Sequence, residues 1–353
     1  MSPLEPAYAA LDASGMLARI MGQPEQIEEA LARSAAHRWH VPIAPDLVAV
    51  GALGGSAIGA DLCAGLYSDR LPRPLLTVRE YRWPACVGRA SIAVLSSYSG
   101  NTEETLALYR EAGMRGIPRV AITTGGALAE ACERDGVAFA RMPGGSPPRA
   151  ALFASWVPLT HLLATLGWVD DPAADWREAA AVLRQGNATL GPDAKEPANP
   201  ARRLAGALHG RMIFIYAASE RLGAVATRVR NQLNENAKLL GHAAVVPELN
   251  HNEIVGWERP GAVHALASVL ILHDREDTAE VTRRLTLTAD YAREQGGAVH
   301  EVSSRGESRI ARLASLVQFG DYLSFWLAMR NGVDPTPIVS IDTFKRRLAE
   351  PPR

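Results

Sequence analysis

Short apolar runs of strand length alternate with helix-like segments along this chain, and this alternation constrains the fold more than any other feature. In the first half the strand-like runs cover residues 47–52, 75–78, 92–95 and 120–123. Helical spacing of apolar residues appears between them at residues 60–66 and 102–112. Strands and helices that alternate at this spacing predict a parallel, doubly wound α/β sheet with right-handed crossovers.

The second half of the chain repeats this pattern. It offers strand-like runs at residues 212–216 and 264–272 and helices at residues 222–237, 276–294 and 310–330. Both halves open with a strand, a turn of small residues and a helix, in VAVGALGGSAIGADLC and in IFIYAASERLGAVATRV. The sequence therefore predicts two copies of one α/β unit.

The turn after a later strand differs between the two copies. The first copy, SIAVLSSYSGNTEETL, has hydroxyl groups and glycine there. The second copy, SVLILHDREDTAEVTR, has Asp274, Glu276 and Asp277. Because carboxylates repel a phosphate group, we expect only the first half to bind one.

The length of 353 residues is enough for two domains, each with its own core. Apolar residues at helical spacing in residues 12–36 predict an N-terminal helical segment, assigned to residues 1–40. We assign residues 41–170 to the first domain, with the phosphate site, and residues 204–353 to the second domain, with a C-terminal helix. Between them, residues 171–203 are rich in Asp, Pro, Asn and Ala, which predicts a linker.

The overall charge and the cysteines exclude several classes of protein. With 37 basic and 38 acidic residues, the net charge of −1 indicates neither a nucleic-acid partner nor an anionic membrane. The three cysteines form no CxxC pair, which argues against a disulfide framework and a zinc site. No signal peptide or membrane-spanning run is recognisable, so we expect a soluble protein of the cytoplasm.

A glycine-rich turn, GGSAIG at residues 54–59, lies between a predicted strand and a predicted helix. Gly55 and Ser56 would let backbone N–H groups approach an anion at the helix N-terminus. The same glycines also suit an ordinary strand-to-helix turn, and this loop alone does not decide between the two. The spacing matches neither GxGxxG nor GK[ST], so no nucleotide cofactor is expected.

A second loop, SSYSGNTEE at residues 96–104, favours the anion site. Ser97, Ser99 and Thr102 supply hydroxyl donors between a strand and a helix. A capping box at the helix start would account for Thr102, but it leaves Ser97 and Ser99 unexplained. We therefore interpret this loop as a phosphate-binding loop.

Three further segments carry groups suited to catalysis. The rigid turn MPGGSPPRA at residues 142–150 presents Arg149, which is either an exposed surface residue or a cation at the ligand-binding edge of the sheet. Residues 232–258 place Glu235 three residues before Lys238, and His251 in a loop rich in Asn. Alone, Glu235 would be a surface partner of Lys238 and His251 would bond its own turn. Lys345, beside two arginines in the C-terminal helix, would belong to a solvated face.

Taken together, these motifs resemble one family. GGSAIG, SYSGNTEETL, PPRAAL, NENAK, PELNHNE and the tail GDYLSFWLAMRNGVDPTPIVSIDTFKRRL are similar to segments of the bifunctional phosphoglucose/phosphomannose isomerases, which belong to the sugar isomerase (SIS) domain superfamily. The resemblance covers nearly the whole chain. It departs at Ala60, where the family often has glycine, and at Ser146-Pro147, where an apolar residue and Gln usually precede Pro-Arg.

The resemblance implies a homodimer in which each chain has two SIS subdomains and the active sites lie at the subunit interface. It implies that no metal or cofactor is needed. It implies interconversion of the 6-phosphates of glucose, mannose and fructose through a cis-enediol. The residues that match the family's phosphate binders are Ser56, Ser97, Ser99 and Thr102. Glu235 matches the base that moves a proton between carbons 1 and 2, and His251 matches the ring-opening residue. Arg149 and Lys345 complete the catalytic set.

These residue types suit that chemistry. A carboxylate can take the proton from either carbon, a histidine can exchange a proton with the ring oxygen near neutral pH, and a fixed guanidinium can stabilise charge on the enediol. Thr336, in the DPTP turn, is small enough to border the reacting carbons and carries a hydroxyl for a sugar oxygen. The alternative is a non-catalytic SIS-domain sensor of sugar phosphates, which would need only the serine loops and not Glu235, His251 and Arg149.

Overall fold

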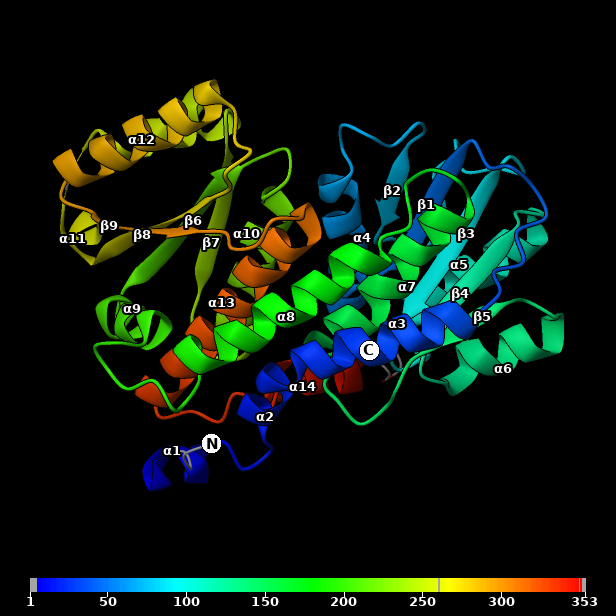
Figure 1. Ribbon diagram of the computed structural model, residues 1–353, viewed down its shortest axis with the longest axis horizontal. Helices are drawn as coiled ribbons and strands as arrows, with labels where there is room; N and C mark the ends of the chain where they lie inside the picture. Colours follow the sequence, from blue (N-terminus) through cyan, green and yellow to red (C-terminus); the bar gives the residue numbers. More distant parts are fainter. Residues whose placement is uncertain (1–4, 260, 349, 351–353) are drawn as a thin grey trace.

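The computed structural model describes residues 5–259, 261–348 and 350. Two α/β units, each built on a parallel sheet, lie at opposite ends of the molecule with long helices between them (Figure 1). In the described part of the chain, no helix is both long and apolar enough to cross a membrane.

The first sheet is parallel throughout and has the strand order β2-β1-β3-β4-β5. Its strands are β1 (Leu47–Ala52), β2 (Leu75–Val78), β3 (Ser91–Ser97), β4 (Arg119–Thr123) and β5 (Phe139–Arg141). Its helices are α4 (Gly54–Leu66), α5 (Glu103–Met114) and α6 (Gly126–Asp135).

Successive residues of the central strand β1 belong to different cores. Val48 and Val50 pack in the core that contains α4, whereas Ala49 packs in the core that contains Leu108 of α5. Side chains alternate between the two faces of a strand, so a strand buried on both faces reads as a continuous apolar run. The prediction of a doubly wound sheet is confirmed.

The second sheet repeats the order with one strand fewer, as β7-β6-β8-β9, and is also parallel. Its strands are β6 (Met212–Ala218), β7 (Gly241–Val246), β8 (Ala267–His273) and β9 (Ala298–Ser303). Its helices are α10 (Gly223–Glu235), α11 (Ala262–Leu266) and α12 (Ala279–Glu294). In each unit the first strand in sequence lies between the second and the third, which confirms the predicted repeat.

The remaining helices surround and join the two units. They are α1 (Pro6–Leu11), α2 (Met16–Met21), α3 (Gln23–Ala36), α7 (Leu152–Thr165), α8 (Ala173–Leu190), α9 (Pro200–Leu208), α13 (Arg309–Arg330) and α14 (Val339–Leu348). Short 3₁₀ turns occur at η1 (Pro148–Ala150), η2 (Glu248–His251) and η3 (Glu253–Trp257). Helix α13 is buried over most of its length and packs on α8, α9 and α10, so it is the central helix of the molecule.

The segment expected to be a linker, residues 171–203, is not poor in core residues. It contains the 18-residue helix α8, which buries Trp176, Leu183 and Leu190 against α3 and α13. The indole Nε1 of Trp176 donates to Thr160 Oγ1 over 2.8 Å. The helical spacing of these apolar residues is present in the sequence, but flanking Asp, Pro and Asn residues obscure it.

Two boundaries in the second unit also differ from the prediction. Residues 264–266 end the helix α11, so the strand β8 begins only at Ala267. Helix α12 begins at Ala279 because the hydroxyl of Thr278 caps it by accepting a hydrogen bond from Val281 N. Residues 276–278 therefore stay in the loop, where Glu276 forms ion pairs.

Candidate active site

The two loops expected to bind an anion lie side by side at one edge of the first sheet. Strands β1 and β3 are hydrogen-bonded neighbours, and their carboxyl ends lead into α4 and α5 on opposite faces of the sheet. The backbone N–H of Tyr98 donates to the hydroxyl of Ser56 over 3.2 Å, which joins the loops directly. Such a point, where the chain leaves neighbouring strands in opposite directions, is where open α/β sheets bind ligands.

The serine loop has an internal order that a simple helix cap does not require. Ser97 Oγ lies 2.8 Å from Thr102 Oγ1 and accepts from Gly100 N over 3.1 Å, while Ser99 Oγ accepts from Asn101 N over 3.2 Å. Thr102 occupies the N-cap of α5, yet its side chain makes no capping hydrogen bond. The capping alternative is thus not what the loop forms, and the Thr102 side chain leaves the first N–H groups of α5 uncapped.

Gly100 is required by this loop. Its φ is +69°, and a Cβ there would lie 1.8 Å from the carbonyl oxygen of Gly125. No side chain fits that space, so the loop can approach the neighbouring turn only with glycine at this position.

Arg149 is the most deeply held cation of the site. It is 2% exposed, and its Nε donates to Asn236 Oδ1 over 2.7 Å. Its Nη2 donates to the carbonyl oxygens of Pro335 and Thr336, each over 2.8 Å. Burial lowers the pKa of Arg149 and the nearby Glu235 carboxylate opposes this, but a guanidinium keeps its charge in proteins. The alternative of an exposed surface arginine is wrong.

Gly55 allows the first loop to lie against the turn that carries Arg149. A Cβ on Gly55 would lie 3.0 Å from the carbonyl carbon of Pro148 and 3.1 Å from Arg149 N. The turn is also fixed on both sides of this contact, since Tyr98 OH accepts from Ser146 N over 2.8 Å and Arg228 Nη2 donates to Arg149 O. The backbone of the turn that carries Arg149 is therefore held against the first loop.

Glu235 ends α10 beside this guanidinium. Its Oε2 lies 3.5 Å from Arg149 Nη1, and its side chain is 28% exposed. Lys238 does not pair with the carboxylate as an i, i+3 surface partner would. Its Nζ donates instead to the carbonyl oxygens of Glu235 over 2.6 Å and Pro335 over 3.3 Å. The carboxylate of Glu235 thus faces Arg149 and remains partly open to a ligand.

A buried polar network fixes α10 below the site. Asn236 is fully buried and its Nδ2 donates to Ser324 Oγ on α13 over 3.0 Å. Arg228 pairs with Asp321 at 3.0 Å, and Gln232 Nε2 donates to the same carboxylate over 2.7 Å. The sequence patterns did not identify Asn236 as a site residue, although its place in NENAK, next to the predicted base, was the one available indication.

Other candidates lie apart from this group. In the described part of the chain, the His251 side chain on η2 is exposed and makes no hydrogen bond or ion pair, and the same holds for Lys345 on α14. Thr336 does lie at the site through its carbonyl oxygen, and its Oγ1 is buried without a partner among the described residues. A buried hydroxyl without a partner is costly, so Thr336 Oγ1 is a candidate contact for a ligand.

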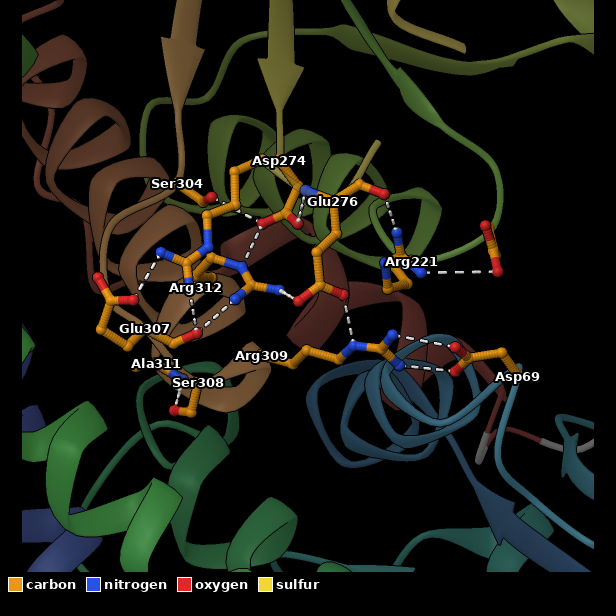
Figure 2. Close-up of polar contacts among 12 residues, drawn as sticks. Asp69, Arg221, Asp274, Glu276, Ser304, Glu307, Ser308, Arg309, Ala311 and Arg312 are labelled. Atoms are coloured by element: carbon orange, nitrogen blue, oxygen red, sulfur yellow. Dashed lines mark hydrogen bonds and ion pairs between the residues drawn. The ribbon is translucent and has the colours of Figure 1, made fainter. Parts of the chain in front are cut away.

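The equivalent position in the second unit is closed by ion pairs (Figure 2). Arg312 Nε donates to Asp274 Oδ2 over 2.9 Å, and both side chains are almost completely buried. Arg309 forms two ion pairs that link the units. Its Nε lies 2.7 Å from Glu276 Oε2, and its Nη1 lies 2.6 Å from Oδ1 of Asp69 in the first unit. Where the first unit carries hydroxyls, this turn carries carboxylates paired with arginines, which supports the expectation of a single anion site.

Among the residues that the structure describes, no group of three or more His, Cys, Asp or Glu side chains is arranged to hold a metal ion. The groups that converge at the site are hydroxyls, helix N–H groups, one guanidinium and one carboxylate. They are suited to binding an oxyanion and moving a proton beside it.

Comparison with known proteins relates this geometry to sugar-phosphate enzymes. Residues 197–348 match the family model described as "Bacterial phospho-glucose isomerase C-terminal SIS domain". The chain is 39% identical over 305 residues to a bifunctional phosphoglucose/phosphomannose isomerase of Caldicellulosiruptor bescii, covering 86% of this chain and 90% of that protein. It is 30% identical to the enzyme of the same name from Aquifex aeolicus over 86% of this chain and 90% of that protein.

Solved structures show the same fold. A hypothetical protein from Thermus thermophilus superposes with a TM-score of 0.72 at 17% identity, over 98% of this chain and 94% of that one. The tagatose-6-phosphate ketose/aldose isomerase from Escherichia coli superposes with a TM-score of 0.68 at 14% identity, over 93% and 97% of the two chains.

Proposed function

The chain belongs to the bifunctional phosphoglucose/phosphomannose isomerase family, and we propose that it interconverts glucose 6-phosphate and mannose 6-phosphate with fructose 6-phosphate. The relatives establish an isomerase with SIS-type subdomains. The observation that carries the choice of reaction is the buried guanidinium of Arg149, held beside the accessible carboxylate of Glu235 next to the serine loops.

In this proposal the substrate phosphate binds at the N-termini of α4 and α5. Ser97, Ser99 and Thr102 donate hydrogen bonds to it, together with Ser56 and the backbone N–H groups of the same loops. No cation is needed at this end, because helix N-termini carry partial positive charge. Ser97 Oγ and Thr102 Oγ1 lie 2.8 Å apart, so the two hydroxyls are gathered at one point.

Glu235 then removes the proton from one of carbons 1 and 2 and returns it to the other, through a cis-enediol. A single carboxylate suffices because the two carbons are adjacent in the enediol. Negative charge that grows on the enediol oxygens is stabilised by Arg149, whose fixed position requires no reorganisation during the reaction. Thr336 Oγ1, which is buried without a partner in the described chain, contacts a sugar hydroxyl.

His251 opens the sugar ring, and we propose that it comes from a second copy of the chain. Within one chain its side chain is exposed on η2 and forms no hydrogen bond or ion pair with Glu235 or Arg149 among the described residues. A homodimer that brings η2 of one protomer to the Glu235 site of the other completes the set. Lys345, which is also exposed on α14, joins the site in the same assembled state.

The alternative of a non-catalytic sugar-phosphate sensor is disfavoured by the same observation. A sensor needs the serine loops but has no use for a desolvated guanidinium facing a carboxylate, since burying an arginine is costly. The site instead holds Arg149 with several hydrogen bonds, in a position where its charge acts on a second charged group.

The direct test supplies fructose 6-phosphate to the purified protein in the presence of a chelator. Glucose 6-phosphate and mannose 6-phosphate are measured separately through coupled dehydrogenases. Formation of both products is the expected result. Binding of fructose 6-phosphate in a calorimeter without formation of either product would favour the sensor.

A further inference from the structure

A cavity of about 320 Å³ lies between α3, β5 and α7, away from the site described above. Trp39, Phe139, Met142 and Pro158 form much of its wall. Figure 1 shows α3 and α7 running past the end of the first sheet at β5, which has no strand on its outer side within the described chain. The volume and the apolar lining are those of a small-molecule site.

Two buried polar atoms at this cavity have no partner among the described residues. Ser34 is 4% exposed, and its Oγ makes no hydrogen bond there. The Nε2 of His37, one helical turn further along the chain, is likewise buried without a partner, and its ring meets Trp39 edge-on at 4.4 Å. Both residues line the cavity. Because buried polar atoms are normally hydrogen-bonded, this pair indicates a ligand that supplies the missing partners.

The charged groups that line the cavity are of one sign. Arg33 and Arg141 line the cavity, and none of its lining residues is Asp or Glu. Each arginine forms an ion pair with a glutamate that does not line the cavity, Arg33 with Glu29 and Arg141 with Glu133. The Arg141 guanidinium lies 5.1 Å from the centre of the Phe139 ring, and its Nη1 and Nη2 bond a carbonyl oxygen and Glu133. In the described structure this leaves its Nε without a partner. Aromatic walls and cationic groups together favour a ring that carries a negative charge.

The cavity touches both ends of the segment that carries Arg149. Met142 begins this segment, residues 142–150, and Ala154 and Pro158 follow it in α7. Helix α3 is hydrogen-bonded to the same part of the chain through the side chain of Gln26. Its Nε2 donates to the carbonyl oxygen of residue 150 over 3.0 Å, and its Oε1 accepts from the backbone N–H of residue 153 over 2.9 Å. A change in the spacing of α3, β5 and α7 would therefore be transmitted to Arg149.

We propose that this cavity is a regulatory binding site for a small aromatic carboxylate, which occupies it with the ring between Trp39 and Phe139 and the carboxylate toward Ser34, His37 and Arg141. Occupation shifts the segment 142–150. Because Arg149 lies 3.5 Å from Glu235, a shift of this segment moves the guanidinium away from the carboxylate and lowers turnover. The effect on turnover depends on the isomerase activity proposed above, whereas the binding does not.

Binding is tested by calorimetry with three probes of similar shape: indole-3-acetate, its neutral amide and the cation tryptamine. We expect indole-3-acetate to bind with a dissociation constant of about 1 mM or tighter, which corresponds to the ordinary efficiency of a ligand of this size. The amide should bind about fivefold more weakly and tryptamine more weakly still. Equal affinity for all three probes would contradict an anion site.

Matched variants locate the site. Ala36→Phe fills the cavity mouth from an exposed position of α3, and Ala32→Phe adds the same ring to an exposed position of α3 that does not line the cavity. We expect loss of indole-3-acetate binding only in the first. Ser34→Ala and Arg141→Gln each remove one polar group of the cavity and should weaken binding about threefold or more. The control is Arg134→Gln, at an exposed position of α6, which should leave binding unchanged. Binding that is the same in Ala36→Phe and Ala32→Phe would overturn the proposal.

The regulatory part is tested with fructose 6-phosphate as substrate. Saturating indole-3-acetate should lower kcat about fivefold in the wild type and in Ala32→Phe, and should leave kcat of Ala36→Phe unchanged. Bound indole-3-acetate without any change in wild-type kcat would overturn the coupling to Arg149. If the protein has no isomerase activity, the calorimetric test still decides whether the cavity binds an aromatic carboxylate.

Discussion

At the scale of single residues, the contacts of the Arg149 guanidinium leave one of its nitrogens for the neighbouring acid. Asn236 and the carbonyl oxygens of Pro335 and Thr336 occupy its Nε and Nη2, so only Nη1 is directed toward Glu235. Asn236 in turn is fixed by a serine hydroxyl on the central helix α13. In the proposed reaction Asn236 is therefore a positioning residue, which acts through Arg149.

Glu235→Gln should lower kcat about a hundredfold or more while leaving the affinity for fructose 6-phosphate within about tenfold, because the amide keeps the shape of the side chain and loses only proton transfer. Coupled assays in both directions and calorimetric binding measure the two quantities. Glu130→Gln, at an exposed position of α6, is the matched control and should resemble the wild type. Turnover of Glu235→Gln within about tenfold of wild type would show that another group is the base.

The paired change Ser97→Ala and Ser99→Ala should raise KM about tenfold or more and remove inhibition by inorganic phosphate, since it deletes two donors to the anion. Thr278→Ala provides the control, because Thr278 caps α12 at the corresponding place in the second unit. That variant should lose some stability and keep both KM and phosphate inhibition. Equal changes in the two variants would mean that both units bind substrate.

Sequence patterns indicated the chemical types at the site but not their partners. NENAK and PPRAAL identified Glu235 and Arg149, yet spacing alone suggested that Lys238 would pair with the Glu235 carboxylate. The ammonium bonds the carbonyl oxygen instead, because Lys238 has a φ of +56° just beyond the end of α10. Such a local turn, like the contact between residues 149 and 336, depends on tertiary packing that one-dimensional spacing does not contain.

At the scale of elements, the two α/β units have diverged at one turn. Both place a loop after the third strand in sequence, β3 or β8, in one unit with hydroxyls and in the other with Asp274 and Glu276. Arg312 and Arg309, both from the first turn of α13, occupy these carboxylates. The position that could hold an anion in one unit thus anchors the central helix in the other.

This anchor predicts a specific response to acid. Burial alone would raise the pKa of Asp274, but hydrogen bonds from Ser304 and Glu276 N and the charge of Arg312 outweigh it, so the pKa lies below the ordinary value of 3.8. A carboxyl group with a depressed pKa in the folded state stabilises the protein above pH 3.8, and this contribution is lost as the pH falls through the folded-state pKa.

Asp274→Asn should therefore lower the free energy of unfolding at pH 7 by about 3 kcal/mol, since it leaves Arg312 buried without its partner charge. Below about pH 4 the variant should lose stability less steeply than the wild type. Urea unfolding between about pH 3 and pH 7 measures both effects, with Glu294→Gln at an exposed position of α12 as the control. An acid slope identical to the wild type would mean that folding does not lower the pKa of Asp274.

The burial of each strand or helix explains whether the sequence predicted it. The central strands β1, β3 and β8 are covered on both faces, so their apolar runs are continuous and were recognised. The edge strand β9 and the outer strand β7 are only half-buried, carry polar residues such as His300 and His242, and were not predicted. Helix α8 was mistaken for a linker because its buried stripe is narrow and its ends are rich in Pro and Asp.

At the scale of the whole molecule, one chain gathers the serine loops, Arg149 and Glu235 but leaves His251 exposed on η2. Helix α14, which carries Lys345, also leaves three apolar side chains about 70% exposed, namely Val339, Phe344 and Leu348. Apolar side chains exposed together on one helix are typical of a surface that is covered in an assembly. Both observations fit a homodimer in which each site takes residues from two chains.

A shared site can be tested by mixing two inactive proteins. Glu235→Gln lacks the base and His251→Gln lacks the ring-opening group, so each homodimer alone should turn over pyranose substrate poorly. When the two variants are unfolded together and refolded, about half of the dimers contain one chain of each kind. In such a mixed dimer, one site has intact Glu235 and intact His251, and the other site has neither. Half of the dimers with one working site each should restore about a quarter of the wild-type activity. Refolding each variant alone is the control, and analytical ultracentrifugation verifies that dimers form. If the mixture is no more active than its components although dimers are present, Glu235 and His251 serve the same site from one chain.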